Sequence, residues 1–101
     1  MEENLNSIFE NSKEIMRNIE ILKTLVLEEE AIRNDMDKTY KEYESGEISR
    51  EMYEELVSSK TQEIAKLKER AVNLLYKITE ASKKIYEMTY SEIREISENI
   101  E

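Results

Sequence analysis

The chain has 101 residues, of which 39% are charged and 39% apolar, and it contains one glycine and no proline, cysteine or histidine. Its formal net charge of −9 disfavours electrostatic binding to nucleic acid or to an anionic membrane, because both usually require a basic excess. Without cysteine, disulfides and thiolate chemistry are excluded, and without histidine the usual carboxylate di-metal site of helical bundles is excluded. This composition predicts a single all-α domain built from long helices.

The first predicted helix covers about residues 3–44. Its apolar residues follow two rows of seven-residue spacing, which together form one stripe along a helix. We expect the first row to be Leu5, Ser12, Ile19, Val26, Arg33 and Tyr40, and the second to be Ile8, Ile15, Leu22, Glu29, Met36 and Tyr43. Further apolar residues flank this stripe and widen it, as in bundles of three or four helices; they are Phe9, Met16, Leu25 and Ile32.

A turn is predicted at residues 45–49, around the only glycine of the chain. Gly46 can adopt a positive φ without steric penalty, as the ends of helices often require. Ser49 is expected to cap the next helix through its hydroxyl, and Ile48 to pack against Tyr53.

The sequence around this turn, Tyr-Glu-Ser-Gly-Glu-Ile-Ser within residues 40–56, resembles the turn of many helical hairpins in archaeal coiled-coil proteins. The resemblance covers less than a fifth of the chain and implies no functional residues. The abundance of Ile, Glu, Lys and Tyr is also typical of thermophilic archaea and their viruses.

The second predicted helix covers about residues 50–99. Its two rows are Val57, Ile64, Ala71, Ile78 and Ile85, and Tyr53, Lys60, Leu67, Leu74, Ala81 and Met88. Ser59 followed by Gln62 fits a capping box, so a break near Ser59 is the alternative to one continuous helix. After Tyr86 the apolar spacing shifts to Tyr90, Ile93, Ile96 and Ile100.

The two helices are expected to form a long antiparallel hairpin, that is, a two-helix coiled coil. The second helix outruns the first, so its last apolar residues lack cover from their own chain. We therefore predict a homodimer that forms a four-helix bundle. The residues expected at this interface, or at the interface with a protein partner, are Ile93, Ile96, Ile100, Leu75, Val72, Tyr86 and Tyr90.

Polar residues interrupt the predicted contact between the helices. Glu29, Arg33 and Lys60 are expected to form a polar layer that fixes the register of the helices. The alternative is that these side chains reach solvent at the edge of the contact.

Positive charge is concentrated in the second helix, where Lys66, Arg70, Lys77 and Lys84 fall along one basic stripe. This stripe could bind phosphates or an acidic partner, or it could pair with acidic residues of the hairpin such as Glu14. A third alternative is that the acidic ends of one hairpin meet the basic middle of another.

The sequence contains no motif for catalysis, for a metal or for a cofactor, so no enzyme activity is predicted. The first hypothesis is a non-catalytic coiled-coil hairpin that self-associates and recruits or scaffolds a protein partner. The alternatives are a nucleic-acid-associated regulator that uses the basic stripe, and an acidic inhibitor that mimics nucleic acid. No signal peptide or membrane span is recognised, so a cytoplasmic protein is expected.

Overall fold

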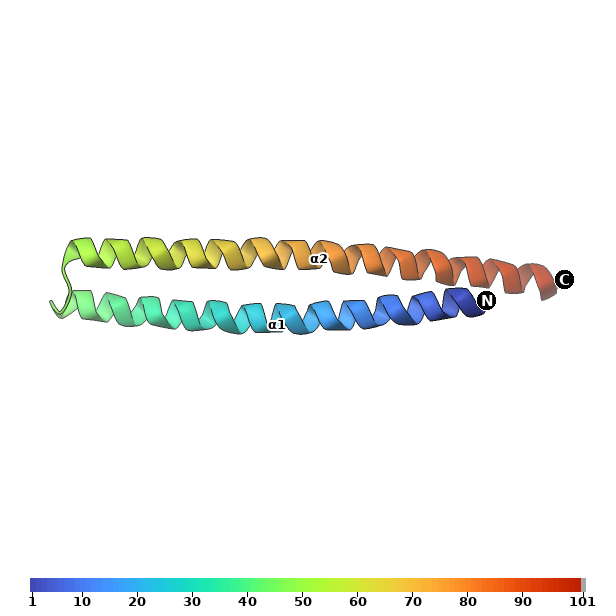
Figure 1. The fold of residues 1–101 in the computed structure, drawn as a ribbon, viewed down its shortest axis with the longest axis horizontal. Helices are drawn as coiled ribbons and strands as arrows, with labels where there is room; N and C mark the ends of the chain where they lie inside the picture. The colour runs from blue at the N-terminus through green and yellow to red at the C-terminus, as the bar shows by residue number, and fades with distance from the viewer. Residues whose placement is uncertain (101) are drawn as a thin grey trace. The chain divides into compact units, whose positions relative to one another are not determined.

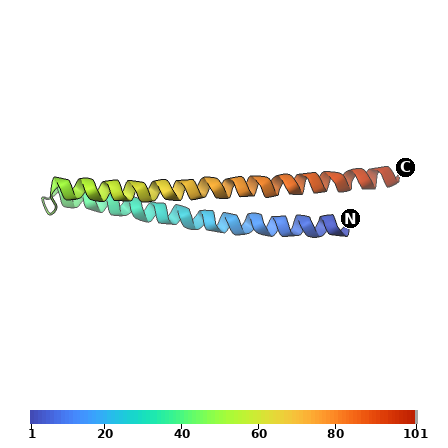
Figure 2. The same ribbon diagram turned by 45° about the horizontal axis from the view of Figure 1, so that its top comes forward.

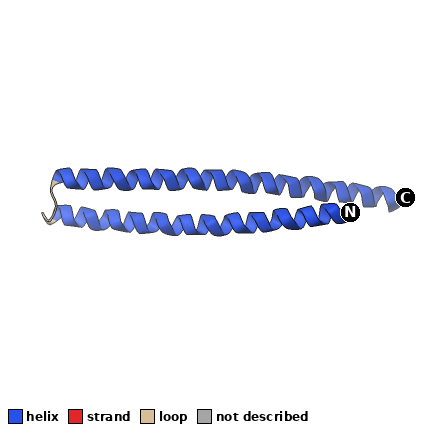
Figure 3. Ribbon diagram, viewed as in Figure 1, coloured by secondary structure: helices blue, strands red, loops and turns tan. Residues whose placement is uncertain are grey.

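The protein is an all-α helical hairpin, as predicted. The computed structural model describes residues 1–100, in which helix α1 covers Glu2–Glu44 and helix α2 covers Arg50–Ile100, and these residues contain no strand (Figures 1 and 3). Neither helix contains glycine or proline, the two residues that most strongly disfavour a helix interior. Because α2 runs without interruption through Ser59, the alternative break at this serine does not occur.

The chain divides into two compact units, each containing a segment of both helices. Unit 2 covers Leu22–Val72 and includes the turn, whereas unit 1 contains Met1–Ile21 and the chain from Asn73 onward. Figures 1 and 2 both show α1 and α2 leaving the turn side by side in unit 2. In unit 1 the beginning of α1 lies beside the last part of α2, where the Asn4 amide donates a hydrogen bond to Glu92 over 2.6 Å.

The turn ends α1 and starts α2 with two complementary caps. Gly46 has a φ of +82°, and its N–H donates to the carbonyl of Tyr43 while that of Glu47 donates to the carbonyl of Glu42. These two bonds form the Schellman motif, which satisfies carbonyls left free at a helix end. The Oγ of Ser49 then accepts a hydrogen bond from the N–H of Met52 over 3.1 Å, as the side chain of an N-cap residue does.

Replacing Gly46 by alanine should lower the free energy of unfolding by about 1 kcal/mol, because a β-carbon disfavours the left-handed backbone. No atom lies within 4 Å of the position that the new β-carbon would occupy, so the loss comes from the backbone and not from a clash. Gly46→Asn is the matched control, since asparagine tolerates this conformation better. Thermal unfolding of both variants measures the difference, and equal loss in the two would contradict this account of the turn.

The contact between the helices, here called the seam, follows a seven-residue repeat in each unit. In unit 2 the seam residues are buried or half-buried; they are Leu22, Leu25, Glu29, Ile32, Met36, Thr39 and Tyr43 of α1, and Tyr53, Val57, Lys60, Ile64, Leu67 and Ala71 of α2. In unit 1 the seam consists of Asn4, Ile8, Asn11, Ile15 and Asn18 of α1, and Leu74, Ile78, Ala81, Ile85, Met88 and Glu92 of α2.

Both predicted rows of α2 lie in the seam, but one of the two rows predicted for α1 is wrong. The row that begins at Leu5 is displaced by one residue, so that Leu25 is buried whereas Ile19, Val26 and Tyr40 are exposed. The row that begins at Ile8 is at the seam as predicted. The second row of a seven-residue repeat can lie either three or four residues before the row that begins at Ile8. The apolar Leu5, Ile19 and Val26 favoured the row three residues before it, whereas the observed row lies four residues before it.

Candidate functional site

An uncharged stripe runs along α2, one position after each seam residue of unit 1 up to Ile93, and continues through Ile96 and Ile100 beyond the last seam residue. Its members in unit 1 are exposed and carry no charge; they are Leu75, Thr79, Ser82, Tyr86, Thr89, Ile93, Ile96 and Ile100. A spacing of three and four residues places them on one face of the helix. The stripe includes five of the seven residues predicted to form an interface.

The remaining two predicted interface residues lie elsewhere. Val72 continues the same row in sequence and is exposed, but it belongs to unit 2. Tyr90 lies beside Tyr86, with ring centroids 6.2 Å apart, but it lines a shallow groove with Glu87, Arg94 and other polar residues. Tyr90 is therefore at the edge of the uncharged stripe and not within it.

α1 carries a matching uncharged stripe that the sequence analysis did not identify as an interface. It consists of Leu5, Phe9, Ser12, Met16 and Ile19, each of which directly follows a seam residue. All are exposed except Ser12, which is half-buried and donates to the carbonyl of Ile8 over 2.8 Å. The stripe is bounded by Glu2 and Lys23, the next residues in the same repeat.

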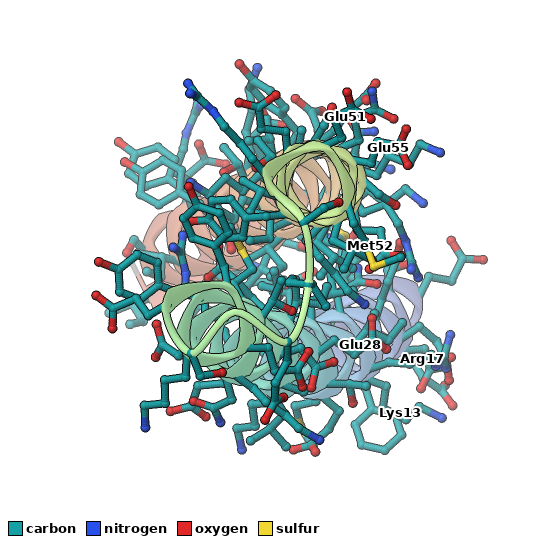
Figure 4. All side chains as sticks on the ribbon, turned by 90° about the vertical axis from the view of Figure 1, so that its left-hand side faces the viewer. Lys13, Arg17, Glu28, Glu51, Met52 and Glu55 are labelled. Atoms are coloured by element: carbon teal, nitrogen blue, oxygen red, sulfur yellow. The ribbon has the colours of Figure 1, made fainter. Side chains whose placement is uncertain are left out.

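The two stripes lie on the same side of unit 1. Residues that follow the seam are rotated by about 100° around each helix, and the sense of this rotation reverses between antiparallel helices. Residues that precede the seam should likewise share the opposite side, and they do: Glu14 of α1 and Lys77 of α2 line one groove in unit 1. In unit 2, Figure 4 shows Glu28 and Met52, which also precede seam residues, on one side.

The corresponding face of unit 2 is charged. Among the positions that follow its seam, the charged residues are Lys23, Glu30, Arg33, Asp37 and Glu44 on α1, and Glu54 and Lys68 on α2. Val26 of α1 and Lys68 of α2 line a shared shallow groove there, which shows that positions after the seam are neighbours in this unit too. The uncharged face is therefore confined to unit 1.

The part of the basic stripe that belongs to unit 1 lies on the side opposite to the uncharged stripe. Lys66, Arg70, Lys77 and Lys84 are exposed, and each directly precedes a seam residue. Lys77 and Lys84 line the same groove as the carboxylates Glu14 and Glu80, so a phosphate in this groove would meet negative charge. Lys66 and Arg70 belong to unit 2.

The predicted polar layer involves a partner that was not anticipated. Lys60 is half-buried in the seam and lies 3.8 Å from Asp35, across the helix contact. Arg33 is exposed after the seam and pairs with Glu29 along α1, at 3.3 Å. Ion pairs this accessible contribute about 0–1 kcal/mol each, and only the Lys60–Asp35 pair joins the two helices and can favour one register.

Asparagines occupy one row of the seam in unit 1, at Asn4, Asn11 and Asn18. Asn18 is only 7% exposed and its Nδ2 has no hydrogen-bond partner, and Glu92, also 7% exposed, accepts from Asn4. Buried polar groups of this kind lower stability but favour one register of the helices. In unit 1, therefore, one of the two seam rows of α1 presents polar residues to α2, while the apolar Leu5 and Ile19 next to it face outward.

Tyrosines close the turn end of unit 2. The rings of Tyr43 and Tyr53 stack with centroids 4.6 Å apart, and Tyr40 lies 6.2 Å from Tyr53. The Glu44 carboxylate, which is hydrogen-bonded to the Tyr40 hydroxyl, raises the pKa of Tyr40 above its usual value. These aromatic contacts stabilise the hairpin close to the turn.

Comparison of the chain with protein-family models, with curated proteins and with solved structures finds no match. Among the described residues, neither helix has a stretch long and apolar enough to cross a membrane. The functional interpretation therefore depends on the distribution of charged and apolar residues over the two helices.

Proposed function

We propose that the protein is a non-catalytic interaction protein that self-associates through the uncharged face of unit 1. The observation that carries this proposal is the pair of adjacent uncharged stripes, which expose Leu5, Phe9 and Met16 of α1 and, beside them, Leu75, Tyr86 and Ile93 of α2. An exposed surface that carries this many large apolar residues and no charge is uncommon on monomers and marks interaction sites. A second copy of the chain supplies an equally long apolar surface, and the resulting unit is a four-helix bundle.

The charged surfaces then remain available to a protein partner. The basic stripe and the acidic turn region have opposite charge, and both lie outside the uncharged face. Surface charge of this kind steers association and selects partners more than it adds affinity. The protein would thus act as a scaffold whose uncharged face forms the dimer and whose charged faces bind a protein partner.

Solution mass tests the self-association. Light scattering coupled to size exclusion should give twice the mass of the chain at micromolar concentration, both at low salt and at about 0.15 M salt. Apolar contacts are insensitive to this change, whereas exposed charge pairs are screened over about 8 Å. A monomer at both salt concentrations, or a mass that falls as salt rises, would contradict self-association through the uncharged face.

A further inference from the structure

We propose that two copies of the chain pair antiparallel through the uncharged face, so that the two chains leave this face toward their turns in opposite directions and α2 lies against α2 of the partner subunit. This inference rests on the proposed function, because it specifies the geometry of the same self-association. It is carried by the limits of the uncharged stripe, by the register within unit 1 and by the charge of the turn region.

The stripe on α1 has a defined centre. It is bounded at one end by Glu2 and at the other by Lys23, so Ser12 lies at its midpoint. The hydrogen bond between Asn4 and Glu92 sets the register of the two helices in unit 1. The two helices run in opposite directions, so a step of eight residues forward along α1 corresponds to a step of eight residues backward along α2. Ser12, eight residues after Asn4, is therefore level with Lys84, eight residues before Glu92. The centre of the face on α2 therefore lies between Ser82 and Tyr86.

A two-fold axis through this centre, perpendicular to the helices, matches the stripe of α2 with itself. The stripe consists of two rows of seven-residue spacing. Each layer of the contact pairs a residue from one row with a residue from the other row of the partner helix, as antiparallel helix pairs require. Leu75 lies beside Ile93 of the partner subunit, Thr79 beside the partner's Thr89, and Ser82 beside the partner's Tyr86. Large apolar side chains thus meet each other at the outer layers, and the tyrosine hydroxyl meets a serine near the axis.

Electrostatics favours this arrangement over the one in which both turns lie at the same end. Residues 42–59 contain six acidic residues and one basic residue, which gives each turn region a net charge of −5. Placing two such regions side by side would bring like charges together, at a free-energy cost that rises as salt falls. In the antiparallel arrangement the two chains leave the contact between the uncharged faces in opposite directions, so the contact does not bring the two acidic regions to the same end.

The absence of cysteine from the chain makes disulfide trapping a clean test. Leu75→Cys and Ile93→Cys are made as separate single variants, one of them with a tag that changes its size, and are mixed, refolded and oxidised. The antiparallel arrangement predicts a disulfide between the two variants and none when either is oxidised alone. The two copies of residue 75 would be about 27 Å apart, which is too far for a disulfide.

A second mixture, of Phe9→Cys and Tyr86→Cys, reports the opposite arrangement. With both turns at the same end, α1 lies against α2 of the partner and residues 9 and 86 come level. A disulfide in this mixture would overturn the antiparallel pairing. The same conclusion would follow if the reduced variants are dimers but neither mixture forms a disulfide. Both outcomes leave the proposed self-association unaffected. If the unmodified chain and the reduced variants are all monomers by light scattering, the proposed function itself fails.

Discussion

Replacing Leu25 by alanine should lower the free energy of unfolding by about 2–3 kcal/mol, as is usual when a leucine is truncated in a packed contact. Leu25 is 3% exposed and packs in the seam of unit 2 near Leu22, Leu67 and Ala71. The value should fall in the lower part of the usual range, because a shallow groove next to Leu25 lets its neighbours relax into the space. Chemical denaturation with urea measures the change.

Leu27→Ala is the matched control, because Leu27 is the same residue type two positions along α1 and is 65% exposed. Its loss should be within about 0.5 kcal/mol, as for other surface substitutions. Val26→Ala adds a third point, since the sequence analysis placed Val26 at the helix contact in place of Leu25. A larger loss for Val26→Ala than for Leu25→Ala would show that the observed seam of α1 is wrong.

The double substitution Ile93→Asp and Ile96→Asp should convert the dimer to a monomer at micromolar concentration. Burying an isoleucine contributes about 1.5–3 kcal/mol, and four are removed per dimer. A micromolar dimer is held by only about 8 kcal/mol, so the loss is comparable with the whole association free energy. The aspartates would also have to be desolvated in an apolar interface. Analytical ultracentrifugation should therefore report the mass of one chain.

Asn73→Asp and Ser91→Asp provide the control with the same added charge. Both residues are exposed on α2 of unit 1, and each directly precedes a seam residue, so they lie on the side opposite to the uncharged stripe. This variant should remain a dimer, and circular dichroism should show equal helix content in the two variants. If both double variants dissociate, net charge and not the uncharged face controls assembly; if neither dissociates, Ile93 and Ile96 are not at the interface.

The elements of the fold could be predicted from the sequence because local signals agreed with each other. One glycine in 101 residues marked the turn, and Ser49 marked the start of α2. Long uninterrupted stretches of helix-forming residues then left little alternative for the rest of the chain. Along α2 the seam row was predictable through Met88, since most of its positions are apolar.

The seam of α1 could not be predicted as well, because its apolar residues occupy two faces. Asn4, Asn11 and Asn18 lie in the seam, whereas Leu5 and Ile19 lie outside it. Hydrophobic periodicity assigns the apolar residues to the inside, so the predicted row is displaced by one residue from the observed one. Only the packing of α1 against α2 shows that the asparagines are the inner residues.

The same error concealed half of the candidate interface. Leu5 and Ile19 were assigned to the contact between the helices, so they were not available as surface residues, and Phe9 and Met16 were interpreted as its margin. The interface was therefore predicted on α2 alone. The signal that would have identified it is the absence of charge one position after every seam residue, over residues 5–19 and 72–100.

Oxidation of the unmodified chain by dilute hydrogen peroxide tests the central claim most directly, because methionine reactivity follows solvent exposure. Met16 lies in the uncharged stripe and is 63% exposed in the hairpin, whereas Met52 lies outside it and is 50% exposed. At tens of micromolar protein, mass spectrometry should show Met16 oxidised several-fold more slowly than Met52, since the partner subunit covers only Met16. If Met16 is oxidised as fast as Met52 or faster, the uncharged face of unit 1 is open to solvent and the chain does not self-associate through it.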